Sequence, residues 1–176
     1  MALYQQLYYL AYGSNLHPLR LTERVPSAKF LFPVELDQYR LYFEKQGQDD
    51  SGKCNIRQTG QAGDTVYAAM YQISMRHKPL LDEFEGLNAG YMDHQLTLQH
   101  QGQEYDFFSY FAQAAYIVEG LSPYHWYKEL VIQGARYLQF PDDYLSAIRS
   151  VESVPDKDIE RCREHQMLIS RMSEYQ

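Results

Sequence analysis

The order of strand-like and helix-like segments constrains this fold more than any other feature of the sequence. Short stretches rich in aromatic and β-branched residues come first, and a helical period dominates the last third of the chain. Strands followed by helices are typical of an α+β fold, in which helices flank an antiparallel or mixed sheet that is open or closed into a barrel. Strands are predicted over residues 7–12, 29–36, 39–44, 54–59, 65–73, 91–98 and 103–111.

Proline, serine and glycine mark where helices begin and end. Pro18 suits the first turn of a short helix. Ser74 can cap a helix that ends near Glu85 with Gly86 as its stop signal, and Pro79 can delay the start of that helix. Further helices are predicted from the Ser122-Pro123 pair onward, over residues 141–148 and over residues 155–172.

Length and charge narrow the classes to which the protein can belong. The 176 residues suit one domain over residues 1–176, with a C-terminal helical extension from about residue 155. Since the net charge is −7 and no basic stripe occurs, nucleic acid is not an expected partner. No apolar run approaches the ~20 residues that cross a bilayer, and residues 1–10 do not resemble a signal peptide. We therefore expect a cytoplasmic protein with no membrane partner.

Motifs for metal binding and for covalent catalysis are missing from the sequence. Cys54 and Cys162 lie far apart, and the six histidines show no paired spacing, so no metal site is expected. No nucleophile elbow, phosphate-binding loop or dinucleotide fingerprint is found. Arg57 could meet a substrate carboxylate, although a surface position on a strand is the simpler interpretation.

Tyr12-Gly13-Ser14-Asn15-Leu16 is the first candidate site. A strand that ends at a glycine and continues into short polar residues leaves backbone N–H groups unpaired, and these can hold a carboxylate or a developing oxyanion. The alternative is an ordinary strand-to-helix turn with Asn15 as the helix cap. Taken by itself, the motif favours this alternative, because such turns are common.

Asp82-Glu83-Phe84-Glu85-Gly86 is the second candidate site. Three carboxylates near a helix C-terminus oppose the helix dipole and repel one another, and both effects raise a carboxylate pKa, as does burial. A carboxyl group with a raised pKa can exchange a proton near neutral pH. The alternative is a solvated acidic helix end, which is the commoner situation, although lysine or arginine would stabilise such an end better.

In this order along the chain, the motifs together resemble the γ-glutamyl cyclotransferase family. Residues 9–16 (YLAYGSNL) are similar to the family's N-terminal signature, and residues 81–86 (LDEFEG), followed by Gly90-Tyr91, resemble its catalytic-glutamate segment. Ser109-Tyr110 stands where the family has a strand that ends in a pocket tyrosine. The stretch from Ser122 to Ala135 resembles the helix that follows.

The resemblance covers about residues 8–150 and implies a mixed β-barrel packed with helices, with no metal and no organic cofactor. It implies that Glu85 is the catalytic acid/base group. The implied partner is a small γ-glutamyl substrate. Whether the protein forms a homodimer is left undecided at this point. The residues that would hold the γ-glutamyl moiety or line its pocket are Tyr12, Gly13, Ser14, Asn15, Leu16, Tyr91, Tyr110 and Tyr127.

The chemistry of a γ-glutamyl compound makes a single carboxylate sufficient. Its α-amine attacks its own γ-carbonyl and closes a five-membered ring, so no covalent serine or cysteine is required. Glu85 would take the proton from the α-amine and deliver it to the leaving amine. The alternatives are a non-catalytic module that binds a small ligand in the same pocket, and an enzyme that acts on γ-glutamylamines or an antibiotic precursor.

Overall fold

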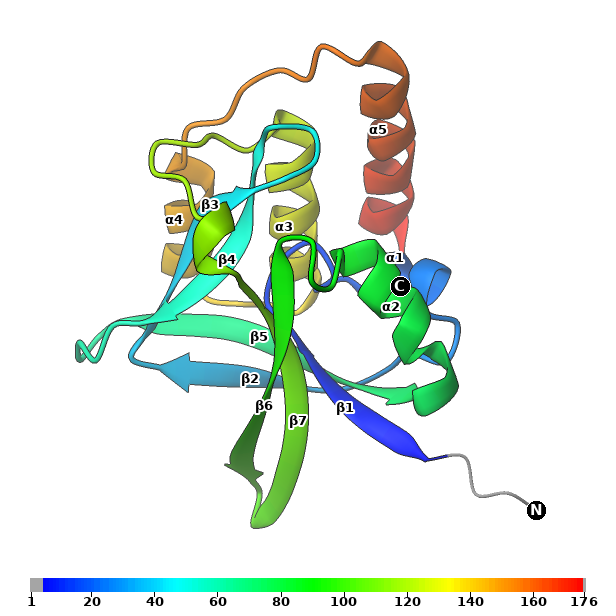
Figure 1. Ribbon diagram of the computed structural model, residues 1–176, viewed down its shortest axis with the longest axis vertical. Coiled ribbons are helices and arrows are strands. Elements are labelled where there is room, and N and C mark those ends of the chain that lie inside the picture. The colour runs from blue at the N-terminus through cyan, green and yellow to red at the C-terminus, as the bar shows by residue number, and fades with distance from the viewer. Residues whose placement is uncertain (1–4, 176) are drawn as a thin grey trace.

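Residues 5–175 are described by a computed structural model, in which a twisted five-stranded sheet packs beneath helices (Figure 1). The strand order is β2-β5-β1-β7-β6. β1 pairs parallel with β7, and every other neighbouring pair is antiparallel. The α+β class and the mixed, largely antiparallel sheet are therefore confirmed. The strands are β1 (Gln6–Ala11), β2 (Lys29–Asp37), β5 (Thr65–Ser74), β6 (Tyr91–His100) and β7 (Gln103–Ala112).

The sheet is not closed into a true barrel, because its edge strands β2 and β6 do not pair with each other within residues 5–175. A separate hairpin, β3 (Tyr39–Gln46) and β4 (Gly52–Gln58), rises from the sheet beside the helices (Figure 1). The strands predicted over residues 39–44 and 54–59 therefore stop short of the turn, because the pairing reaches Gln46 and Gly52. Lys45 pairs with Lys53, and the N–H of Gly47 donates to the carbonyl of Ser51 at 2.9 Å, so backbone pairing continues through polar residues.

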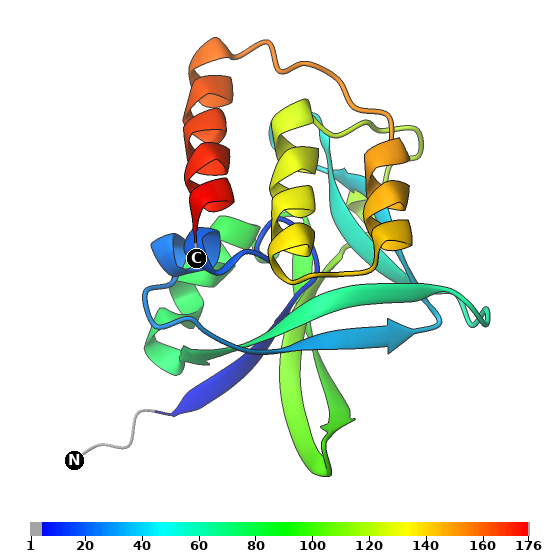
Figure 2. The same ribbon diagram turned by 180° about the vertical axis from the view of Figure 1, so that it is seen from behind.

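The three C-terminal helices lie side by side on one side of the sheet, with α3 in the middle in both views (Figures 1 and 2). α5 packs against α3 and α1. Among residues 5–175, no helix combines the length and the apolar character that a membrane span requires. The organisation of residues 1–176 as one domain stays a prediction. The helices are α1 (Pro18–Arg24), α2 (Lys78–Glu85), α3 (His125–Tyr137), α4 (Asp142–Ser150) and α5 (Ile159–Glu174), with 3₁₀ turns at Met75–His77 and Ala114–Tyr116.

The boundaries of α2 place its last residue at the site. Ser74 caps the preceding 3₁₀ turn rather than α2 itself, since its hydroxyl accepts from the N–H of Arg76. α2 then begins at Lys78 with Pro79 in its first turn, which confirms the delayed start. Gly86 ends the helix with a φ of 66°, in the left-handed region that glycine adopts without strain, and so leaves Glu85 in the last turn.

The pairing of β1 with β7 brings distant segments together. In parallel strands the C-terminal ends lie at the same edge, so the loop after β1 lies beside the end of β7. This loop is anchored from below by Tyr71, whose hydroxyl donates to the carbonyl of Leu16 at 2.7 Å. It is pressed from above by α3, where a Cβ on Gly134 would lie 2.5 Å from the Cβ of Leu16. The loop is therefore held from two sides at the C-terminal ends of β1 and β7.

Candidate active site

The structure brings Glu85 and the loop after β1 into contact, although they lie far apart in the chain. The side-chain amide of Asn15 donates to Oε1 of Glu85 at 2.5 Å. Both residues line a narrow inner pocket of about 30 Å³. Leu16 does not line this pocket, because its side chain is fully buried behind the loop. The pocket is lined by Tyr9, Tyr12, Gly13, Ser14, Asn15, Cys54, Glu85, Tyr91, Tyr110 and Tyr127.

Asn15 links a guanidinium to the carboxylate. Arg24 donates from Nη1 to Oδ1 of Asn15 at 3.1 Å, which fixes which end of the amide faces Glu85. The same amide nitrogen lies 3.3 Å from the hydroxyl of Tyr9. The interpretation of Asn15 as a helix cap is wrong, because α1 is capped by His17, whose Nδ1 accepts from the N–H of Leu19 at 3.1 Å.

The pKa of Glu85 is raised above its ordinary value, and burial is the main cause. Arg24, Arg20, the hydrogen bond from Asn15 and Lys45 act in the opposite direction and limit the rise of this pKa. A carboxyl group with a moderately raised pKa is suited to accept and return a proton.

The neighbouring carboxylates do not crowd Glu85 as the sequence suggested. Asp82 accepts from Nζ of Lys78 at 2.7 Å and from the hydroxyl of Tyr110 at 2.6 Å, so it is paired away from the pocket. Glu83 is exposed. Burial, rather than repulsion among the three carboxylates, therefore distinguishes Glu85 from its neighbours.

The tyrosines form a wall whose hydroxyl groups are tied to the backbone. Tyr91 donates to the carbonyl of Cys54 at 2.5 Å, and Tyr12 donates to the carbonyl of Tyr110. The hydroxyl of Tyr127 accepts from the N–H of Cys54 at 3.0 Å. Burial raises the pKa of Tyr12, Tyr91 and Tyr127 well above the usual range. These side chains therefore stay protonated and shape the pocket instead of acting as bases.

Gly13 is required by the close approach of β4. A Cβ at this position would lie 2.8 Å from the Cβ of Cys54 and 3.2 Å from its Sγ. Burial raises the pKa of the Cys54 thiol to about 12, so this thiol is not a nucleophile at neutral pH. Cys54 acts here as a small apolar residue that the loop packs against.

Gly13→Ala should lower the free energy of unfolding by about 1–3 kcal/mol, the usual cost of overpacking a rigid interior. Urea denaturation followed by circular dichroism measures it. The double variant Gly13→Ala/Cys54→Gly removes the atom that the new methyl meets, so alanine should cost much less in the Cys54→Gly background. An equal cost in both backgrounds would mean that contact with Cys54 is not the reason for glycine at position 13.

A second and larger cavity of about 520 Å³ lies outside the inner pocket. Ser14, Glu85, Tyr91 and Tyr127 line both cavities, so they form the passage between them. Residues of the 45–53 hairpin, α1, α3 and α5 complete the outer wall. The C-terminal helix that the sequence marked as an extension therefore contributes to the site, through Arg161 and His165.

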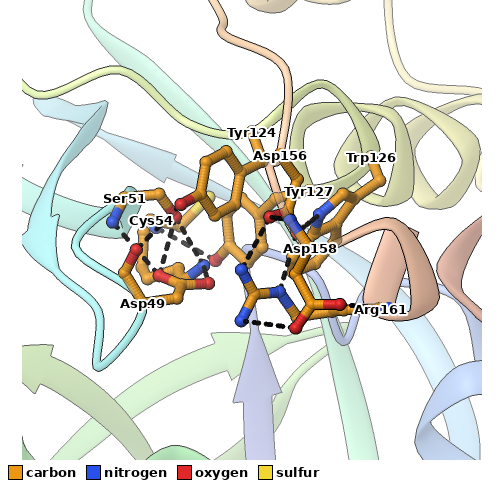
Figure 3. A network of polar contacts seen from close by, with 10 residues as sticks. Asp49, Ser51, Cys54, Tyr124, Trp126, Tyr127, Asp156, Asp158 and Arg161 are labelled. Atoms are coloured by element: carbon orange, nitrogen blue, oxygen red, sulfur yellow. Dashed lines mark hydrogen bonds and ion pairs between the residues drawn. The ribbon is translucent and has the colours of Figure 1, made fainter.

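A polar network holds the start of α5 against α3 (Figure 3). Arg161 donates to both carboxylate oxygens of Asp156 at 2.7 Å, and the indole N–H of Trp126 donates to Oδ2 at 2.8 Å. The Asp156 side chain is fully buried, and Arg161 holds its pKa well below the usual range. Beside this network, Lys53 lies with its Nζ 5.0 Å from the centre of the Trp126 ring and donates to Asp49 at 2.7 Å.

Asp156→Asn should destabilise the protein by about 1–3 kcal/mol, because Arg161 loses its charged partner. A carboxylate with a depressed pKa contributes stability above its unfolded pKa of about 3.9, and this stability is lost as pH falls. The difference in unfolding free energy from the parent protein should therefore shrink below about pH 4. Asp158→Ser is the control, since it removes only the weaker ion pair at 3.8 Å and keeps a capping oxygen. A difference that stays constant down to pH 2 would contradict this account.

Sequence reasoning missed the cations of the outer cavity. Arg20 and Arg24 are spaced i, i+4 on α1, which places them on one helix face behind the candidate loop, and this signal was present in the sequence. Lys45 lies just outside the strand predicted over residues 39–44, and the structure places it in β3. Arg57 was considered as a carboxylate ligand, but it pairs with Glu44 and lines neither cavity around Glu85.

Comparisons with known proteins agree with this arrangement. The model of the AIG2-like family matches residues 65–148, which include Glu85 and the three pocket tyrosines that follow it. The γ-glutamylcyclotransferase of Homo sapiens is 30% identical to this chain over an alignment of 151 residues, with coverage of 82% of this chain and 78% of the human protein. The chain belongs to the γ-glutamylcyclotransferase family. The Bos taurus γ-glutamylcyclotransferase aligns with the same identity and coverage.

Solved structures agree with membership of the γ-glutamylcyclotransferase family. A γ-glutamyl cyclotransferase with 25% identity superposes with a TM-score of 0.77 over 95% of this chain and 99% of its own. An uncharacterized protein from Homo sapiens with 28% identity superposes with a TM-score of 0.78 over 94% of this chain and 98% of its own. This member of the family is therefore an enzyme, which sets aside the non-catalytic binding module.

Proposed function

We propose that this enzyme converts a γ-glutamyl amino acid or amine to 5-oxoproline and a free amine, with Glu85 as the acid/base group. The contact between Asn15 and Glu85 carries this proposal, because it holds one partly buried carboxylate at the mouth of a small polar pocket. A carboxylate in such a place can exchange protons with a bound ligand.

The reaction needs proton transfers at both nitrogen atoms and one internal attack. Glu85 takes a proton from the substrate's α-ammonium group, and the resulting amine attacks the γ-carbonyl carbon to form a tetrahedral intermediate. The attacking nitrogen then gives up its second proton to solvent and becomes the ring N–H, while the bond from the carbonyl carbon to the leaving nitrogen breaks and Glu85 returns the first proton to that nitrogen. Because the nucleophile belongs to the substrate, the protein's task is to fold the γ-glutamyl chain into attack geometry, which is worth several kcal/mol.

We assign to Ser14 the stabilisation of the charge that develops on the carbonyl oxygen. It lines both cavities, and within residues 5–175 neither its N–H nor its hydroxyl has a hydrogen-bond partner. A donor that is already oriented and unpaired stabilises an oxyanion without reorganisation. The buried rings of Tyr12, Tyr91 and Tyr127 exclude water around the reacting atoms.

A panel of γ-glutamyl compounds tests the proposal. The purified protein is incubated with γ-glutamyl amino acids, γ-glutamylamines and glutathione, and 5-oxoproline is quantified by mass spectrometry. We expect 5-oxoproline and the free amine in equal amounts from at least one compound. Free glutamate instead of 5-oxoproline would show hydrolysis, which would contradict the internal attack.

A further inference from the structure

The outer cavity carries a positive charge that the chain as a whole does not. Its wall holds five cationic side chains and three acidic ones, whereas the net charge of the chain is −7. A cluster of one sign in the wall of a cleft attracts ligands of the opposite sign. The cationic residues are Arg20, Arg24, Lys45, Lys53 and Arg161.

Three of these cations already have polar partners. Lys53 pairs with Asp49, and Arg161 pairs with Asp156. Arg24 donates to the side chain of Asn15 and thereby belongs to the machinery around Glu85.

The other two cations, Arg20 and Lys45, are buried and form no ion pair within residues 5–175, and the carboxylate that acts on both is Glu85, which they share with Arg24. Arg20 is 5% exposed, and its Nε has no hydrogen-bond partner within residues 5–175. Lys45 is also 5% exposed, and no carboxylate in the described part of the chain forms an ion pair with it. Its Nζ lies 4.7 Å from the ring centre of Tyr91 and 5.8 Å from that of Tyr116. Burying three cations around one carboxylate is costly, so Arg20 and Lys45 point to a further ligand of opposite charge.

The backbone makes room for Lys45. A Cβ on Gly90 would lie 2.6 Å from Nζ, and the φ of 134° at this position also favours glycine. Lys45 comes from β3 and Arg20 from α1, so the two cations stand on different walls of the cavity. Two charges of one ligand can be bound by residues on separate walls.

The size of the two cavities decides which part of a substrate meets these cations. The inner pocket of about 30 Å³ accepts only the reacting end, and Glu85 lies in the passage to the outer cavity. The group attached to the γ-carbonyl therefore extends into the outer cavity. The volume of this cavity, about 520 Å³, is larger than a small amine would fill.

We propose that Arg20 and Lys45 form an anion subsite for the leaving group, and that the preferred leaving group is an acidic amino acid or peptide with two carboxylates. This inference rests on the proposed function, and it makes the two residues specificity-determining for the reaction. A neutral leaving group would bring no carboxylate to either cation.

Three substrates of similar size test the subsite, because their leaving groups carry two, one and no carboxylates. They are γ-glutamylglutamate, γ-glutamylglutamine and γ-glutamylglutaminamide. We expect kcat/KM to fall about tenfold or more with each carboxylate lost, as charge-assisted hydrogen bonds imply. Equal kcat/KM for the three compounds would overturn the subsite and leave the proposed function standing.

Two variants assign the effect to the cations. In Lys45→Met, which keeps the aliphatic stem, and in Arg20→Gln, the ratio of kcat/KM for γ-glutamylglutamate to that for γ-glutamylglutaminamide should fall about tenfold. The ratio cancels any change in Glu85, since both substrates use it. Lys29→Met removes an exposed lysine on β2 outside both cavities and should keep the parental ratio. A parental ratio in Lys45→Met would overturn the role of Lys45 even if Arg20→Gln fails to fold.

A binding measurement separates the two proposals. N-acetyl-L-glutamate mimics the acylated leaving group, and calorimetry should show that it binds more tightly than N-acetyl-L-glutaminamide and depends on Lys45. Such binding without 5-oxoproline from any substrate would refute the proposed function while supporting the subsite. Equal affinity for the two mimics would count against the subsite.

Discussion

Glu85→Gln should lower kcat by at least about 100-fold, the lower range for the loss of a general acid/base group. Glutamine keeps the shape of the side chain and can still accept from the amide of Asn15. It cannot take up and return a proton. Single-turnover release of 5-oxoproline, measured with the best substrate of the panel, gives the rate of the chemical step. If the variant released 5-oxoproline at the parental rate, Glu85 would not be the acid/base group.

Glu83→Gln is the matched control for this variant. It removes one carboxylate from the same helix end, but the Glu83 side chain is exposed and lies outside the inner pocket. Its kcat should stay near the parental value, which tests whether proton transfer rather than local charge matters. Asp82→Asn is less suitable, because Asp82 accepts from Lys78 and Tyr110.

The stability of Glu85→Gln should equal or exceed that of the parent protein at pH 7. Since the folded pKa of Glu85 is raised, ionisation of this group costs stability above the folded pKa and costs nothing below the unfolded one. Glutamine removes that cost, so the difference should vanish at low pH. A destabilised variant would mean that the Glu85 charge holds the structure together.

The elements of the fold could be predicted from local patterns. β7 and β5 were recognised within two residues of their ends, because period-two patterning and flanking turns act locally. The hairpin over residues 39–58 was harder, since its polar strand ends pair by backbone contacts that composition does not reveal. The open edges of the sheet depend on which strands meet, which is a property of the whole chain.

Two motifs of the candidate site could be predicted from the sequence, but the spatial arrangement of all its residues could not. The family resemblance identified Glu85 and the loop after β1, and the parallel pairing of β1 with β7 explains how chain topology places that loop at the site. Three causes of a raised pKa at Glu85 were open from the sequence, and burial proves to be the main one; a sequence does not rank them, because burial depends on the folded structure. The cations of the outer cavity come from three separate segments, and only tertiary structure brings them together.

Asn15→Leu should lower kcat/KM about 10- to 100-fold at pH 6, through the orientation and the pKa of Glu85. Leucine fills the same buried position but cannot donate a hydrogen bond. Since that hydrogen bond lowers the pKa of Glu85, its loss raises this pKa further. Glu85 must be deprotonated to accept the substrate's proton, so the acid limb of the kcat/KM profile should move to higher pH.

The pH profile shows whether Asn15 positions the carboxylate or merely packs the loop. A loss of activity with an unchanged acid limb would indicate packing alone and would contradict the positioning role. Arg24→Met is a second test of the same hydrogen-bonded chain, because Arg24 both orients the amide of Asn15 and lowers the pKa of Glu85. Its acid limb should also move to higher pH. The double variant should lose less than the sum of the two single effects on transition-state free energy, since Arg24 and Asn15 act through one hydrogen-bonded chain that ends at Glu85.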